Sequence, residues 1–377
     1  MITRRAALLF AVLLALPGLP AHSQIAGGAV GTNLLVADAV LPPAGTLRFA
    51  AAVSPVHARN YFPVTGGRAG IPDSLGGSMT AASFGLQALF TAAPGWTVGA
   101  SWMPGVAALS SFSADENRRA LSFAPVHLAV ARQITGGINP LFAGSVAGSA
   151  PPPGGGPGSP LTTTAALIVA VPIPWPDYEI QLDRLNQGGT YVAENSGVRA
   201  WAVGYQLAAH WIPGAPPAAA FEYRPASPWS LHATHDLLIF LPAPYESAGV
   251  TEYEQNQIWK TIPDIEPFDT INYRFQVGVE VEPRLHLTAL TGSMWRVGVP
   301  VAWRYRPAPV FDGELAVRDT QEWSVHAGIT AAVTPFGMRR HLEFIFDYRA
   351  PVAGKNLRAE HRLGVGLAVD FISRRTP

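Results

Sequence analysis

Apolar and polar residues alternate along much of this chain with a period of two. Between Ile271 and Glu282 the odd positions are apolar, and the even positions are polar or glycine. That period is typical of a β-strand with one apolar and one polar face. The pattern recurs at 295–306, 198–212 and 341–349, and weaker copies occupy 47–53, 79–91, 95–107, 119–132, 161–172, 229–241, 321–333 and 358–371. No long segment favours a helical period, so the chain is predicted to be all-β.

Two architectures accommodate many alternating strands: a soluble β-sandwich or barrel, and a transmembrane barrel. The polar faces contain many Gly, Ala and Ser residues between the Arg, Glu and His residues, as a barrel lumen does. Only 14% of the residues are charged and 48% are hydrophobic, whereas a soluble surface commonly carries about 25–35% charged residues. We therefore predict an antiparallel transmembrane β-barrel whose apolar faces contact lipid.

Aromatic residues recur on the apolar faces at a spacing that fits a membrane. Trp201 and Trp211 share a face ten residues apart, and so do Trp295 and Tyr305. Ten residues make ~33 Å of strand, which a tilt of about 40° projects to ~25 Å along the membrane normal. These four residues are candidates for the girdles at the two lipid interfaces. Chance spacing in an aromatic-rich β-protein is the alternative.

The connections between the alternating segments indicate the strand count. Shorter connections are expected at 92–94, 213–228, around Pro283 and at 334–338, and long ones at 54–78, 108–118, 134–160, 173–196, 242–267, 307–320 and 350–357. Eleven connections predict about twelve strands with both termini in the periplasm, and only 134–160 is then long on the periplasmic side. A fourteen-strand alternative splits 284–306 at Thr291–Ser293 and adds a strand at 218–224.

The ends of the chain predict export and a four-part organisation. Residues 1–23 have Arg4 and Arg5, then an apolar run, then Ala21-His22-Ser23, which is the pattern of a cleaved signal peptide. Residues 24–45 are expected to lie in the periplasm or to plug the lumen, and 46–372 to form the barrel. The segment 134–160 is a Pro/Gly-rich linker within it, and 373–377 form a C-terminal extension.

Composition and motifs exclude several function classes. The charges balance, with 26 Lys and Arg against 26 Asp and Glu, and there is no cysteine, so we predict no nucleic-acid partner and no thiolate chemistry. The nucleophile-elbow, zinc-protease, phosphate-loop and dinucleotide motifs are absent. The cluster from His232 to Asp236 splits its two histidines between opposite strand faces, which weakens a metal site. We predict no enzyme activity, no cofactor and no metal.

Charged residues on the polar faces should point into the lumen, because a charge on the lipid face costs about 2–4 kcal/mol near the midplane for Arg. They can act as an electrostatic filter for solutes, or as a ladder of ion pairs that fills the lumen and stiffens the wall. The lumen-lining candidates are Arg274, Glu280, Arg296, Arg304, Arg306, Glu343, Asp347 and Arg349, with Glu282, Arg362 and Asp370 beside them.

The last predicted strand resembles the signal that outer-membrane barrels present to the barrel-assembly machinery. Gly366, Val369 and Phe371 fit that pattern. Gly364 stands where a polar residue is usual, and 373–377 follow where the aromatic residue is normally terminal.

Together with the signal peptide, the alternation and the girdle spacing, this strand makes the chain resemble Gram-negative outer-membrane β-barrel proteins over almost its whole mature length. The resemblance implies location in the outer membrane, contact with its lipid and lipopolysaccharide, and passive passage of a small-molecule solute. An acidic segment at 242–267 could bind cations that bridge lipopolysaccharide.

The general character of the sequence is similar to small-solute and hydrophobic-compound channels, including those encoded beside aromatic-degradation pathways, but no motif assigns one of them. A structural or surface-interaction barrel with a closed lumen is the second hypothesis, and a lipid-modifying barrel enzyme is the third.

Overall fold

The fold is taken from a computed structural model of the 377-residue chain. It describes residues 41, 44–63, 65–70, 78–102, 104–109, 118–123, 125–135, 161–172, 201–212, 228–245, 269–288, 293–307, 310–311, 314–315, 321–335 and 342–372. The predicted signal peptide, the extension at 373–377, and most of 24–45, 134–160 and 242–267 lie outside these residues. No helix in the described part of the chain is long and apolar enough to cross a membrane.

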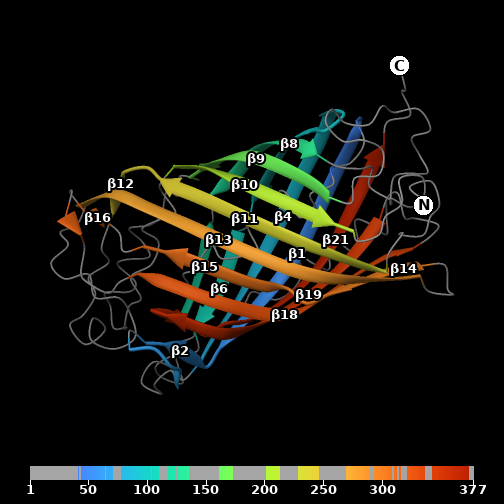
Figure 1. Cartoon of the computed structure of the whole chain (residues 1–377). Coiled ribbons are helices and arrows are strands. Elements are labelled where there is room, and N and C mark those ends of the chain that lie inside the picture. Colours follow the sequence, from blue (N-terminus) through green and yellow to red (C-terminus); the bar gives the residue numbers. More distant parts are fainter. Residues whose placement is uncertain are drawn as a thin grey trace.

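The described chain forms a closed antiparallel barrel of twelve strands, as predicted (Figure 1). Several wall strands are recorded as two consecutive segments with a short break between them. In chain order the wall consists of β1 (Thr46–Ala58), β4 (Met79–Ala93), β5 and β6 (Trp96–Trp102, Pro104–Leu109), β7 and β8 (Arg118–Phe123, Val126–Thr135), β9 (Leu161–Val171), β10 (Ala202–Trp211), β11 and β12 (Trp229–Phe240, Ala243–Tyr245), β13 (Asp269–Thr288), β14 and β15 (Ser293–Gly298, Val301–Arg306), β18 (Glu322–Pro335), β19 (Leu342–Lys355) and β21 (His361–Ile372).

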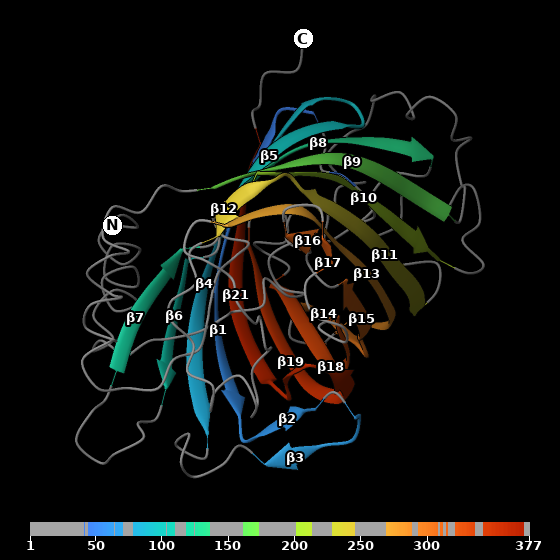
Figure 2. The same ribbon diagram turned by 90° about the vertical axis from the view of Figure 1, so that its left-hand side faces the viewer.

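Pairing between the first and last strands closes the wall. β1 pairs with β4 on one side and with β21 on the other, over registers that include Thr46 with Ile372 and His57 with His361. Figure 2 views the molecule from the end that carries β12 and β16, and the wall curves round on itself there. We call this the far end, and the end where β1 begins and β21 ends the near end. Because closure leaves no sheet edge, the backbone groups of the wall are paired within it.

The two faces of the wall have an inverted polarity compared with a soluble protein. Outward residues of the described strands are apolar and exposed, with Leu167 on β9 the extreme at 72%. Inward residues include buried polar and charged side chains such as Gln206, Asp236 and Glu280. The single alternation therefore produces an apolar outer surface and a polar lumen, as a transmembrane barrel requires.

One expected connection is wrong, although the strand count holds. Pro283 does not end a strand, because β13 runs through it to Thr288, and the next described strand, β14, begins at Ser293. Pro283 lies opposite the break between β14 and β15, which contains Pro300. Pro283 faces Val299, whose N–H donates to the Pro283 carbonyl at 3.1 Å, within the interrupted part of this ladder. The missing N–H group of Pro283 therefore removes no bond from an intact stretch of it.

Two predicted far-end loops are also shorter than expected. β1 continues to Ala58 within the predicted loop 54–78, and β19 continues to Lys355 within the predicted loop 350–357. A register shift beside Val325 and His326 lets β19 pass through Pro351 without losing its partner. Beyond the wall, β2 (Asn60–Phe62) pairs with β3 (Ala69–Gly70) and β20 (Leu357–Arg358), and β16 (Val310–Phe311) pairs with β17 (Glu314–Leu315) and β13.

The mid-strand position Leu167 tests whether the outer surface contacts lipid. Replacing it by Arg in Leu167→Arg should lower the free energy of unfolding by about 2–4 kcal/mol, because a charge near the midplane must be transferred into hydrocarbon. Urea unfolding in lipid vesicles measures this change. Leu167→Met is the matched control and should stay within ~1.5 kcal/mol of the parent. Equal stability of the Arg and Met variants would contradict burial of this face in lipid.

Candidate functional site

The lumen wall divides into two arcs of different chemistry. The inward faces of β13, β14, β15, β18, β19 and the ends of β21 and β1 carry arginines and carboxylates, which we call the charged arc. The inward faces of β4, β8, β9, β10 and the end of β11 carry no ion pair among the described contacts, and they combine buried polar residues such as Gln87, Gln133 and Gln206 with a cluster of small and apolar side chains. We call this cluster and the wall around it the apolar arc. Its buried cluster consists of Leu89, Ala129, Ala131, Ala166, Ile168, Ala208 and Leu238, with Phe240 packed against it.

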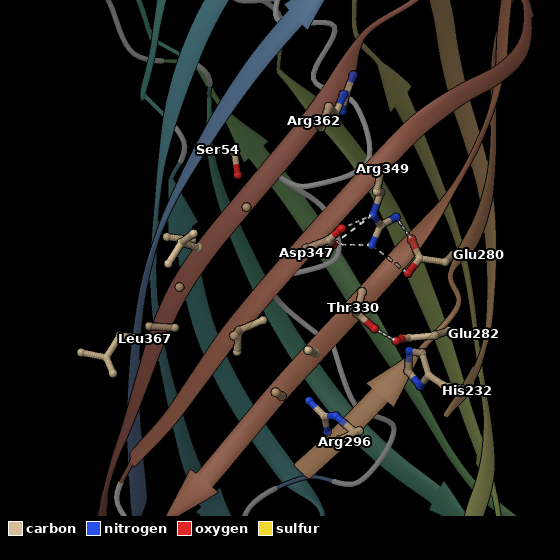
Figure 3. Close-up of a pocket in the computed structure, with 18 of the residues that line it drawn as sticks. Ser54, His232, Glu280, Glu282, Arg296, Thr330, Asp347, Arg349, Arg362 and Leu367 are labelled. Atoms are coloured by element: carbon tan, nitrogen blue, oxygen red, sulfur yellow. Dashed lines mark hydrogen bonds and ion pairs between the residues drawn. The ribbon is translucent and has the colours of Figure 1, made fainter. Parts of the chain in front are cut away.

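The centre of the charged arc is an arginine shared by two carboxylates. Nη1 and Nη2 of Arg349 donate to Glu280 at 2.5 and 3.2 Å, and Nη2 and Nε donate to Asp347 at 2.9 and 3.0 Å. Figure 3 shows Arg349 between the two acids. β19 and β13 are separated in the wall by β15 and β18. The Arg349–Glu280 pair therefore crosses the lumen side of two intervening strands.

Glycines make room for two further charged groups. Arg304 pairs with Asp236, which is 1% exposed and lies two strands away, and its guanidinium lies over Gly278 on the strand between them. A methyl group at Gly278 would lie 2.5 Å from Arg304 Cζ. Glu282 lies in the same way over Gly298, and it accepts hydrogen bonds from Arg284 and Thr330.

Ion pairs continue toward both ends of the charged arc. Toward the near end, Glu343 accepts from Arg296 at 3.0 Å and from Arg48 at 2.8 Å, so one carboxylate joins three strands. Asp370 lies 3.6 Å from the same Arg48. Toward the far end the further pairs are Arg306–Glu322 at 3.1 Å and Arg362–Glu360 at 2.9 Å.

A cavity of about 160 Å³ lies inside the barrel against the charged arc. Its charged side includes Arg349, Asp347 and Glu282, whereas β1 and β21 line it with small residues such as Ala52 and Gly366. Figure 3 shows Ser54 and Arg362 toward one end of the cavity and Arg296 toward the other. The small side chains of β1 and β21 thus leave a space, and arginines and carboxylates of the other strands line its remaining sides.

Leu41 lies among the residues of the apolar arc, and its side chain is buried with theirs. It belongs to the segment 24–45, for which both a periplasmic position and a plug were expected. Gly45 then donates its N–H to the carbonyl of Thr91 at 2.8 Å, where the chain enters β1. This part of the segment therefore lies on the lumen side of the wall, and the remainder of 24–45 stays outside the described residues apart from Ala44.

The predicted lumen residues are placed as follows. Glu280, Arg296, Arg304, Arg306, Glu343, Asp347 and Arg349 are members of the charged arc and its ion pairs. Arg274 is in β13, but its side chain is outside the described part. Sequence reasoning missed Arg48, Arg284, Glu322 and Glu360. Arg284 was missed because a strand boundary was expected at Pro283, whereas continued alternation through the proline would have marked it as inward.

The girdle candidates and the last strand also have definite positions. Trp201, Trp211 and Trp295 are exposed, and Tyr305 stacks on exposed Trp303 with ring centroids 6.0 Å apart. On β21, Phe371 is exposed and its ring meets that of Phe49 edge-on at 6.1 Å, whereas Gly366 faces the lumen and Val369 pairs with Phe49 and Leu342. Their roles at the lipid interface and in assembly remain predictions.

The histidine cluster on β11 splits as the strand pattern predicted. His232, Thr234 and Asp236 are buried on the lumen side, and His235 stacks on Tyr205 with centroids 5.6 Å apart. Within the described ranges, no group of three or more His, Asp or Glu side chains is arranged to hold a metal ion.

Comparison with known proteins places the fold. No family model matches the chain, and no curated protein matches it. The COG4313 outer membrane channel from Pseudomonas putida F1 is similar in structure with a TM-score of 0.52 at 12% identity, over 89% of this chain and 98% of that one. The β domain of the Bordetella autotransporter BrkA gives a TM-score of 0.44 at 9% identity, over 87% and 100% of the two chains.

A third similar structure is the translocator domain of the autotransporter NalP from Neisseria meningitidis, with a TM-score of 0.39 at 10% identity over 90% and 94% of the two chains. At these identities the likeness is one of fold. The likeness to the COG4313 channel, together with the closed twelve-strand wall and its apolar outer face, leads to one conclusion. The chain has the fold of Gram-negative outer-membrane β-barrel proteins.

The space above Gly278 should be essential for the Arg304–Asp236 pair. Gly278→Ala places a methyl group against the guanidinium, so Arg304 must move and leave the buried Asp236 carboxylate poorly paired, at about 1–3 kcal/mol. Urea unfolding of the refolded barrel measures the loss. Gly364→Ala is the matched control, because its Cβ would lie 3.4 Å from the Cβ of Asp347, an ordinary contact. Equal stability of the two variants would show that the pair does not need this glycine.

Proposed function

We propose that this protein is an outer-membrane channel that lets small molecules cross passively through the barrel lumen. The observation that carries the proposal is the cavity between the small-residue wall of β1 and β21 and the charged arc. Arginines and carboxylates line it together with Ala52, Ser54 and Gly366. Charged side chains that border a cavity inside a membrane barrel favour a lumen that contains water. Transfer of each charge into dry hydrocarbon would cost several kcal/mol.

The outer surface supports a position in the outer membrane. Exposed apolar residues continue round the described strands, and the girdle candidates Trp201, Trp211 and Trp295 are among the exposed residues. The near end, where β1 begins and β21 ends, is then periplasmic, and the far end faces outward. The structure with the highest overlap reported above is an outer membrane channel. It supports the proposal at the level of fold, and the solute has to be argued from this lumen.

A closed, structural barrel is the second candidate, because one observation favours it. The Arg349–Glu280 pair crosses the lumen side of two strands. Twelve strands leave a narrow lumen, which a few such pairs can fill. The expectation that the protein is not an enzyme stays a prediction, and so does cleavage of a signal peptide.

Membrane fractionation tests the location. We expect the protein in the outer-membrane fraction, and we expect the unboiled band on an SDS gel to migrate differently from the boiled band, because a closed barrel resists SDS until heated. A soluble periplasmic protein with one band in both samples would contradict the proposal. Such a result would require the apolar outer face to be covered by something other than lipid.

Single-channel conductance in planar bilayers tests passage itself. The parent should conduct, and Ala52→Phe should lose most of the conductance, because the ring would fill the cavity beside the charged arc. Val53→Phe is the matched control: this neighbouring residue of β1 points to the outer face and does not line the cavity, so the change should leave conductance unchanged. A parent protein that inserts but conducts no current would favour the closed barrel. Equal currents through the two variants would place the path elsewhere.

A further inference from the structure

One row of inward-facing residues joins a guanidinium to an apolar surface. Arg296 on β14 pairs in register with Ala332 on β18, and Ala332 pairs with Ile345 on β19. Ile345 pairs with Gly366 on β21, and Gly366 with Ala52 on β1. All five residues line the cavity. A molecule lying along this row would meet a permanent positive charge at one end and apolar groups along the rest.

Guanidinium groups outnumber carboxylates in the cavity wall. It is lined by four arginines and three acids, namely Arg284, Arg296, Arg349, Arg362, Glu280, Glu282 and Asp347. The carboxylates that pair with Arg296 and Arg362 are Glu343 and Glu360, and neither is a lining residue. The surface of the cavity therefore exposes one more guanidinium group than carboxylate groups, with Glu343 and Glu360 behind two of the arginines. An anion is favoured there by an accessible guanidinium and not by a net charge of the lumen.

Arg296 is the most accessible of these arginines. Its side chain is 20% exposed, compared with 7% for both Arg284 and Arg349. Its partner Glu343 also pairs with Arg48, which in turn lies 3.6 Å from Asp370. Figure 3 shows Arg296 projecting toward the cavity. A guanidinium has five N–H donors in a planar fork that matches a carboxylate, which makes it suited to hold the acid group of a solute.

The size of the cavity limits the apolar part of that solute. Its volume of about 160 Å³ is close to the roughly 150 Å³ of an engineered apolar protein cavity that binds benzene. Ile345, Ala332 and Ala52 provide contacts for a body of that size. A solute with one ring, or with an alkyl chain of similar volume, would fill the space.

We propose, as an extension of the channel function proposed above, that the cavity selects small organic acid anions with an apolar body of about one ring. The carboxylate binds Arg296, and the apolar body lies along Ala332, Ile345, Gly366 and Ala52. Carboxylate and guanidinium form a charge-assisted pair, while the opposite wall contacts the part of the solute that water solvates poorly. An inorganic ion or a sugar could not make both the charge-assisted contact with Arg296 and the apolar contact with the opposite wall, so neither would be selected.

Transport into liposomes that contain the purified full chain tests this selection with matched probes. Benzoate, benzylammonium and benzyl alcohol share a ring and differ in charge, whereas acetate shares the carboxylate and lacks the ring. We expect benzoate to enter faster than each of the others. In Arg296→Gln the preference for benzoate over benzylammonium should fall by roughly tenfold, as for the loss of a charge-assisted hydrogen bond.

Two further variants separate this site from a general charge effect. Arg306→Gln removes a lumen arginine that pairs with Glu322 and does not line the cavity, and it should retain the benzoate preference. Ile345→Thr puts a hydroxyl into the apolar row, and it should lower the ratio of benzoate to acetate while keeping both anions ahead of benzylammonium. Each variant is first checked for the heat-dependent gel shift of a folded barrel.

The outcomes distinguish this inference from the channel function. If the parent conducts ions but takes up benzylammonium as fast as benzoate, the anion selection is wrong and the channel stands. If Arg306→Gln loses the preference as fully as Arg296→Gln, the selection comes from the overall charge of the lumen and the site is wrong. If the parent conducts no ions in planar bilayers, both the channel and its selectivity fall.

Discussion

Closure of the sheet by hydrogen bonds between β1 and β21 is the constraint on which the rest of the structure depends. An open edge in hydrocarbon would leave backbone N–H and C=O groups unsatisfied, at several kcal/mol each. Once the wall is closed, every strand has an inside and an outside. In a sequence with a period of two, alternate residues then contact lipid and the lumen, and no other structural feature is needed to separate them. The long registers of β1 with β21 and β4 meet this requirement at the seam between the first and last strands of the wall.

The lumen depends on a second balance, between side-chain size and charge. At Gly278 and Gly298, a missing side chain lets Arg304 and Glu282 lie over the neighbouring strand. Each such group then reaches a partner beyond its adjacent strand. The pairs reduce the cost of burying the charges, and the glycines keep the wall thin. The opposite arc holds a cluster of Leu, Ile and Ala side chains among uncharged polar ones such as Gln87 and Gln206. The result is a lumen whose ion pairs are concentrated on one side.

Much of this architecture could be predicted from the sequence, because it follows from local alternation. To predict the strand count, the closure and the inward position of Glu280 or Arg304, it was enough to know which residues share a face of each strand. The ends of strands were harder: proline usually ends a strand, but Pro283 lies where the neighbouring ladder is already broken.

The partners of the charged residues could not be predicted, because they depend on register. Arg304 and Asp236 are 68 residues apart in sequence and meet only because two intermediate registers align Gly278 between them. That arrangement also shapes how the chain can diverge. Positions 236, 278 and 304 form a set. Losing either charged residue leaves the other charge buried without this partner, and adding a side chain at 278 creates a steric overlap with Arg304. The outer face requires only an apolar side chain, so its residues can be substituted one at a time during evolution. The three residues of such a set have to be substituted together or stay unchanged.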